Sequence, residues 1–90
     1  MNSNADTTRR YSVYSVLGPV EEGERKKPFT LTELQALVGG YIEIRSTGER
    51  LAVLDEEGFI KKKPLNLKAS KVLGFSVFGC VIICDPELIN

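Results

Sequence analysis

The segment "FTLTELQALVGGYIEIR", residues 29–45, contains the signals that decide the fold, beginning with the start of a helix. Thr30 and Glu33 have the spacing of a capping box. In this motif the threonine hydroxyl accepts a hydrogen bond from the backbone amide of the glutamate. In return, the glutamate carboxylate accepts a hydrogen bond from the backbone amide of the threonine. Phe29 and Leu34 occupy the two positions of a hydrophobic staple. We therefore predict that a helix begins directly after Thr30.

The same segment predicts where this helix ends. Leucines recur at helical spacing as far as Val38. Gly39 follows, and glycine readily takes the left-handed backbone conformation that closes many helices. The expected helix spans residues 31–38. Because a helix this short is marginal by itself, it must pack on a sheet.

The remaining strong signals predict that sheet. Residues 41–45 and 50–55, "YIEIR" and "RLAVLD", alternate in side-chain type on either side of the turn "STGE", which predicts a β-hairpin over 41–54. Residues 11–17, "YSVYSVL", predict a first strand. Residues 77–84, "VFGCVIIC", are apolar on both faces, which is typical of an interior strand.

Three segments complete the pattern. The charged residues 20–28 predict a solvated loop, and residues 59–61 a short strand or extended piece. Residues 62–74 predict a second helix, with Asn66 as its N-cap and Gly74 as its end.

The expected fold class is α+β: a mostly antiparallel sheet of four to five strands with two short helices. A single domain is expected over residues 11–90, after a flexible N-terminal segment at 1–10. The predicted core consists of Leu31, Leu34, Leu37, Ile42, Ile44, Val53, Val72, Val81 and Ile83.

Composition argues against catalysis. The 90 residues include no histidine, so the commonest general base and metal ligand is missing. Cys80 and Cys84 lie in the most apolar segment, where a thiolate is disfavoured, and on one strand they are too far apart for a disulfide. The acids at 55–57 lack the ligand spacing of a calcium loop and predict a solvated turn. We expect a protein that is not an enzyme, with no catalytic residue, cofactor or metal site.

The sequence also gives expectations about location. It contains neither the apolar core of a signal peptide nor a run long enough to span a membrane. We therefore expect a soluble protein inside the cell, in the host cytoplasm or nucleus, without a membrane partner.

Two surfaces are candidates for binding. The first is a lysine cluster without acids, which would suit phosphates, nucleotides or single strands; a solvated face is the favoured interpretation of it. The second is one face of the hairpin, which is either a partner-binding surface or a face covered by the 20–28 loop. The residues of the first are Lys61, Lys62, Lys63, Lys68 and Lys71; those of the second are Tyr41, Glu43 and Arg45.

Four segments resemble a family of short proteins of phages, plasmids, bacteria and larger viruses that is known only as a domain of unknown function. The pattern L-x-x-L-Q-x-x-V-G-G-Y-I-E lies at 31–43, and an acid-glycine turn at 56–58. An N-x-x-A-[ST] helix start lies at 66–70, and a closing strand that begins with a glycine at 79–83. The resemblance covers roughly residues 29–84. Where the family commonly has Asn-Glu before the turn glycine, this chain has "DEE".

The resemblance implies a fold and a viral or mobile-element origin, but no catalytic residue. We therefore expect a small accessory protein that acts as a non-catalytic binding module for a host or viral macromolecule. The alternative is nucleic-acid or nucleotide binding through the lysines of residues 61–71. Self-association is a further expectation, because the chain is rich in strands and its closing strand is strongly apolar.

Overall fold

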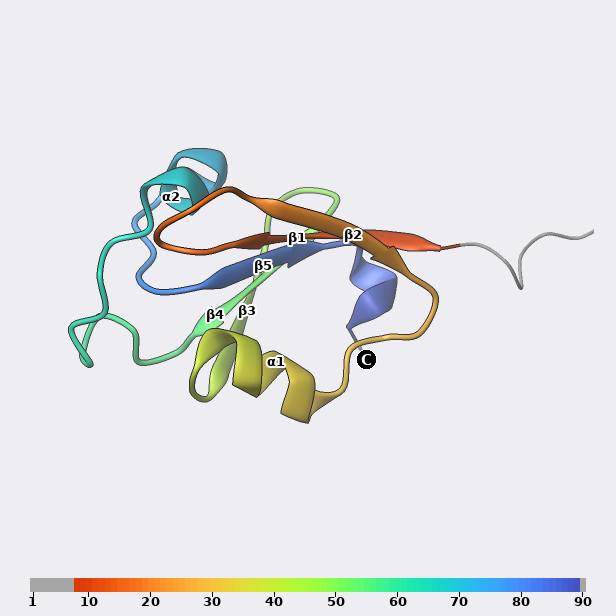
Figure 1. Cartoon of the computed structure of the whole chain (residues 1–90), viewed down its shortest axis with the longest axis horizontal. Helices are drawn as coiled ribbons and strands as arrows, with labels where there is room; N and C mark the ends of the chain where they lie inside the picture. Colours follow the sequence, from red (N-terminus) through yellow and green to blue (C-terminus); the bar gives the residue numbers. More distant parts are fainter. Residues whose placement is uncertain (1–7, 90) are drawn as a thin grey trace, which may run out of the picture.

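The computed structural model describes residues 8–89, which form a five-stranded antiparallel sheet with two α-helices and one short 3-10 helix (Figure 1). This confirms the predicted α+β class. In chain order the elements are β1 (Arg9–Tyr14), β2 (Glu21–Arg25), α1 (Leu31–Val38), β3 (Ile42–Ser46), β4 (Leu51–Asp55), α2 (Leu67–Leu73), β5 (Val81–Cys84) and the 3-10 helix η2 (Pro86–Leu88).

The last strand of the chain lies in the middle of the sheet. The strand order is β2-β1-β5-β4-β3, and all four pairs of neighbours are antiparallel. β5 therefore joins the β1–β2 hairpin to the β3–β4 hairpin, which confirms the predicted interior strand. It begins four residues later than expected, because Gly79 has a φ of 86° and Phe78 forms only an isolated bridge with Leu65.

Side-chain alternation along the central strands divides the core in two. Ile82 and Cys84 of β5 belong to a cluster on the side of α1, whereas Val81 and Ile83 belong to one on the side of α2. β4 divides in the same way, since successive side chains of a strand point to opposite faces. Figure 1 shows the two helices on opposite sides of the sheet.

The core prediction is correct for Leu34, Val53, Val81 and Ile83, which are buried, and partly correct for Ile42, which is half-buried. It is wrong for four residues that are exposed: Leu31, Leu37, Ile44 and Val72. α1 has only eight residues and buries just Leu34 and Val38. Ile44 lies on an edge strand, and α2 buries Ala69 instead of Val72.

Residues 20–28 are not the solvated loop that their charge predicts, because residues 21–25 form β2 and pair with β1. Gly23 lies opposite Tyr11, and a Cβ atom at position 23 would come within 2.6 Å of the Tyr11 ring carbon Cζ. The glycine therefore makes room for a ring. Residues 59–61 form turns instead of the expected short strand or extended piece.

The N-terminal boundary also differs, since β1 begins at Arg9 and not at residue 11. The expected flexible segment otherwise falls mostly on residues 1–7, which lie outside the described part of the chain.

The capping box of α1 is present as predicted. The amide of Glu33 donates to Thr30 Oγ1 (3.0 Å), and the amide of Thr30 donates to Glu33 Oε1 (2.8 Å). The Thr30 amide is also the main reason that the pKa of Glu33 is lowered. Phe29 and Leu34 are buried in the same cluster, as the staple requires, and Gly39 ends the helix with a φ of 81°.

Asn66 caps α2 as predicted and also ties this helix to the sheet. Its side chain is fully buried. Oδ1 accepts from the amide of Ala69 (3.1 Å), while Nδ2 donates to the carbonyls of Tyr14 and Gly79 (both 2.8 Å). One amide group thus joins the end of β1, the start of α2 and the segment before β5.

We expect Asn66→Ala to lower the free energy of unfolding by about 3 kcal/mol, because it leaves two carbonyls and one amide without partners. Thr30→Ala, which removes only an exposed cap, is the matched control and should cost about 1 kcal/mol. Urea unfolding followed by circular dichroism measures both. Equal losses for the two variants would contradict the tying role of Asn66.

Candidate functional site

Residues 56–63, here called the display loop, follow β4 at one end of the molecule (Figure 1), and residues 56–62 form consecutive turns. The residue before the loop, Asp55, is buried. It pairs with Ile42 of β3, so its side chain lies on the same side of the sheet as α1. The prediction of a solvated turn is therefore wrong for Asp55, although Glu56 and Glu57 are exposed.

Both oxygens of the Asp55 carboxylate have partners within the display loop. Lys61 Nζ lies 3.0 Å from Oδ2, and Lys63 Nζ contacts the same oxygen. Oδ1 accepts a hydrogen bond from the amide of Glu57 (2.8 Å). A carboxylate that no solvent reaches is thus neutralised by two lysines that follow it in the chain.

The same two ammonium groups close the C-terminal end of α1. Lys63 Nζ donates to the carbonyl of Val38 (2.7 Å), and Lys61 Nζ donates to that of Gly39 (3.3 Å). Carbonyls at the end of a helix lack partners within the helix and carry partial negative charge, so cations are favourable there. The ion pairs therefore hold the display loop, β4 and α1 together.

Burial alone would raise the pKa of Asp55, since it disfavours the charged form. The hydrogen bonds from Lys63, from the amide of Glu57 and from Lys61 outweigh this effect and lower the pKa to about 2. The carboxylate is therefore ionised at every ordinary pH, and it serves as a fixed acceptor and not as a proton donor.

Glycines allow these groups to approach one another. A Cβ atom on Gly40 would lie 2.9 Å from Asp55 Oδ2 and would also collide with Lys61 Nζ. One on Gly79 would lie 2.8 Å from Lys63 Cδ, and one on Gly58 would lie 2.8 Å from the carbonyl oxygen of Phe78. The "GG" after α1 thus has two functions, because Gly39 ends the helix and Gly40 leaves space for the ion pairs.

The display loop presents two large apolar side chains to solvent. Phe59 is 74% exposed and Ile60 is 76% exposed. The ring of Phe59 lies 5.3 Å from that of Phe78, which belongs to the segment between α2 and β5. The sequence predicted a short strand or extended piece here and did not indicate this exposure. The signal for their exposure is an apolar pair between the acids of "DEEG" and the lysines of "KKK".

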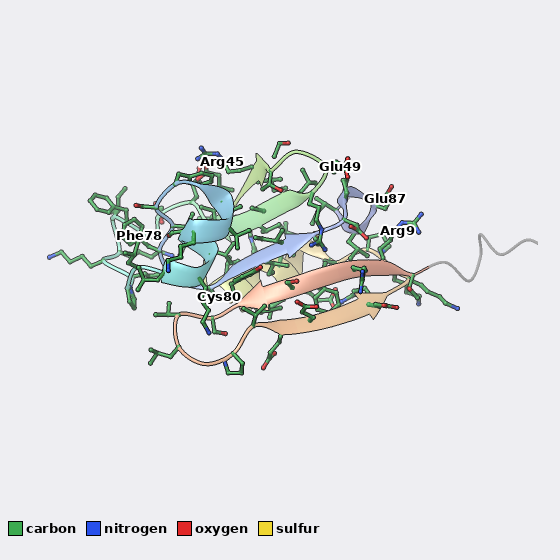
Figure 2. All side chains as sticks on the ribbon, turned by 90° about the horizontal axis from the view of Figure 1, so that it is seen from above. Arg9, Arg45, Glu49, Phe78, Cys80 and Glu87 are labelled. Carbon is green, nitrogen blue, oxygen red and sulfur yellow. The ribbon has the colours of Figure 1, made fainter. Side chains whose placement is uncertain are left out.

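A small hollow of about 160 Å³ lies beside these rings, lined among others by Glu43, Arg45, Phe59, Phe75 and Phe78. The Arg45 guanidinium lies 4.4 Å from the centre of the Phe75 ring. Figure 2 shows Arg45 beside α2 and Phe78 at the end of the molecule that carries the display loop.

The three predicted hairpin residues do not form one surface. Glu43 and Arg45 of β3 border the hollow beside Phe75, whereas Tyr41 precedes β3 and borders another hollow with Gln35 of α1 and Lys61. Tyr41 is exposed, and Arg45 forms an ion pair with Glu43 (3.3 Å). The alternative interpretation, in which residues 20–28 cover these side chains, is wrong because β2 and β3 lie at opposite edges of the sheet.

The five predicted lysines are directed to different places. Lys61 and Lys63 are engaged with Asp55 and α1, while Lys68 of α2 donates to the carbonyl of Gly18 in the turn after β1. Lys71 lies in the last turn of α2, and Lys62 is exposed in the display loop, with a φ of 61°.

Both cysteines are free. Cys84 is buried, and burial raises its pKa to about 11, whereas Cys80 is only half-buried. In residues 8–89 no three of the His, Cys, Asp and Glu side chains gather where they could hold a metal ion. None of the helices described is long and apolar enough to cross a bilayer.

The lowered pKa of Asp55 makes stability depend on pH. The ordinary value is 3.8 and the folded value is about 2. The group therefore contributes stability above about pH 4 and loses it as the pH falls towards 2, a change of about 2 kcal/mol. Asp55→Asn should cost about 3 kcal/mol at pH 7, since two lysines lose their carboxylate.

The difference between wild type and Asp55→Asn should accordingly shrink by about 2 kcal/mol between pH 7 and pH 2. Urea unfolding at several pH values measures it, with Glu56→Gln as the matched control on an exposed neighbour. A difference that stays constant with pH would contradict the assigned pKa.

Comparison with known proteins supplies a family and nothing more specific. Neither the curated proteins nor the solved structures contain a match to this chain. The family model described as "Domain of unknown function (DUF3846)" matches residues 16–88, which include every element from β2 to η2. This chain belongs to that family of proteins of unknown function.

Proposed function

We propose that this protein is a non-catalytic interaction module that binds a partner protein through the display loop. The observation that carries the proposal is the exposure of Phe59 and Ile60 on a loop that a buried ion-pair cluster holds in place. Large apolar side chains at adjacent exposed positions are typical of binding surfaces when they form part of a patch, here with Phe78.

The fixed shape of the loop favours binding. Ordering a loop and its side chains on association costs free energy, and a loop that is already ordered avoids much of that cost. Backbone hydrogen bonds add to the ion pairs, since the amide of Lys61 donates to the Glu57 carbonyl (2.9 Å) and that of Lys63 to the Gly58 carbonyl (3.0 Å). The loop therefore presents its apolar pair in one conformation.

The surroundings of the apolar pair define the partner. Exposed acids precede it, at Glu56 and Glu57, and the exposed Lys62 follows it. A matching surface would have an apolar pocket for the phenylalanine ring, bordered by charges of both signs. We propose a host or viral protein inside the cell as this partner, in keeping with the resemblance to proteins of phages and other mobile elements.

Nucleic-acid binding through the lysines has less support from the structure. Lys61 and Lys63 both pair with the buried Asp55 carboxylate, so its single negative charge already offsets part of their positive charge. The exposed acids of the display loop would also repel a phosphate backbone. Of the five candidate lysines, Lys62, Lys68 and Lys71 remain for this alternative.

The test is affinity capture from host-cell lysate with the full chain as bait. We expect a Phe59→Ser/Ile60→Ser double variant to capture at least about tenfold less of a specific partner protein than the wild type does. The reason is that a few anchor residues supply most of the binding free energy of an interface. Leu67→Ser is the matched control, because Leu67 is also well exposed (62%) but lies on α2. If the Phe59→Ser/Ile60→Ser variant and the Leu67→Ser control weaken capture equally, the proposed role of the display loop is contradicted.

Nuclease treatment of the same lysate separates the two functions. The proposal predicts that nuclease leaves capture unchanged. If capture disappears with nuclease, and binding to DNA or RNA falls with salt and with serine substitution of Lys62, Lys68 and Lys71, the nucleic-acid alternative replaces the proposal.

A further inference from the structure

We propose that two copies of this chain associate by pairing their β3 strands, antiparallel and edge to edge, so that the two sheets become one. β3 is the last strand of the sheet. A strand in this position has unpaired backbone groups along its outer side, which form a template for another strand. The argument depends on which residues supply these groups and which side chains the pairing would bring together.

Two hydrogen bonds at the ends of the hairpin show which residues of β3 direct their N–H and C=O groups towards β4 and which direct them outward. The amide of Glu56 donates to the carbonyl of Tyr41 (2.9 Å), and the amide of Thr47 donates to the carbonyl of Arg50 (2.8 Å). Backbone groups alternate in direction along an antiparallel strand, so the odd-numbered residues of β3 bond to β4. Ile42, Ile44 and Ser46 therefore direct their N–H and C=O groups outward.

This alternation favours a dimer in which the two-fold axis between the two β3 strands passes through Ile44. Two antiparallel β3 strands centred there pair Ile44 with Ile44 of the second copy, and Ile42 with Ser46, using only outward-directed groups. Glu43 then lies directly opposite Arg45 of the second copy. The alternative centres, Glu43 and Arg45, would place like charges opposite each other, which is unfavourable.

The charges needed for this register are already in position. Glu43 and Arg45 lie on the same face of β3 and form an ion pair within one chain (3.3 Å). Pairing two strands around Ile44 would join both ion pairs into one network of four alternating charges. Such a network favours one register over the others.

The opposite face of the pairing would be apolar. Ile44 is 43% exposed, and Leu31 at the start of α1 is 58% exposed. Both border a hollow of about 190 Å³, to which Ile42, Leu34 and Ile89 also contribute. The pairing would bring Ile44 of each copy together and remove apolar surface from water, which favours association.

The other strands do not offer an equivalent edge. At the opposite edge, β2 carries Glu21, Glu22 and Glu24, so a second copy centred on Gly23 would place glutamates opposite each other. The expectation that the apolar closing strand drives self-association needs correction, since β5 is paired on both sides in the middle of the sheet. Of the two sheet edges in residues 8–89, the β3 edge is therefore the one at which a second copy can pair without placing like charges opposite each other.

Analytical ultracentrifugation of the full chain, from about 5 to 500 µM, tests the proposal, since an interface of one strand pair is small and expected to be weak. We expect a reversible dimer in the wild type. Glu43→Arg and Arg45→Glu should each weaken it at least about tenfold, because each places like charges opposite each other. An equimolar mixture of the two variants should form a heterodimer again, because arginines then lie opposite glutamates.

Recovery in the mixture separates lost pairing from lost folding, since a misfolded variant would not regain a partner. A wild type that stays monomeric over the whole range would overturn the proposal. Single variants that dimerise as strongly as the wild type, or a mixture that forms no heterodimer, would overturn the register centred on Ile44.

Discussion

The interaction on which the rest of the structure depends is the buried carboxylate of Asp55 with Lys61 and Lys63. A buried charge is costly unless it is paired and hydrogen-bonded, and here two ammonium groups and one amide satisfy it. Buried ion pairs add little net stability compared with apolar packing, but removing one partner costs several kcal/mol. We infer that the cluster acts mainly to fix the positions of α1, β4 and the display loop relative to one another.

The two proposed surfaces follow from this arrangement but use different residues. The cluster holds the display loop in one conformation, which presents Phe59 and Ile60 as apolar anchors at one end of the molecule. The β3 edge lies beside it and offers the outward backbone of Ile44, with Glu43 and Arg45 as its charges. A dimer paired through β3 would therefore carry two copies of the display loop, which would strengthen binding to a partner that engages both loops at once.

Local signals in the sequence are sufficient for part of this fold. The capping box at Thr30, the Asn66 cap and the alternation along β4 are determined by near neighbours, and each appears where it was predicted. The sequence did not predict β2, because a charged strand at the edge of a sheet does not show the alternation of apolar and polar residues that marks a strand. The burial of Asp55 was missed because its lysine partners lie six and eight residues further along the chain, in a turn that no helix or strand period indicates.

Amide hydrogen exchange measured by NMR tests most directly whether Asp55 fixes the display loop. In the wild type at neutral pH, the amides of Glu57, Lys61 and Lys63 should exchange at least about tenfold more slowly than in an unstructured chain, although the loop is exposed. In Asp55→Asn these three amides should lose their protection while those of β5 keep theirs. Wild-type loop amides that exchange at the unprotected rate would contradict the account.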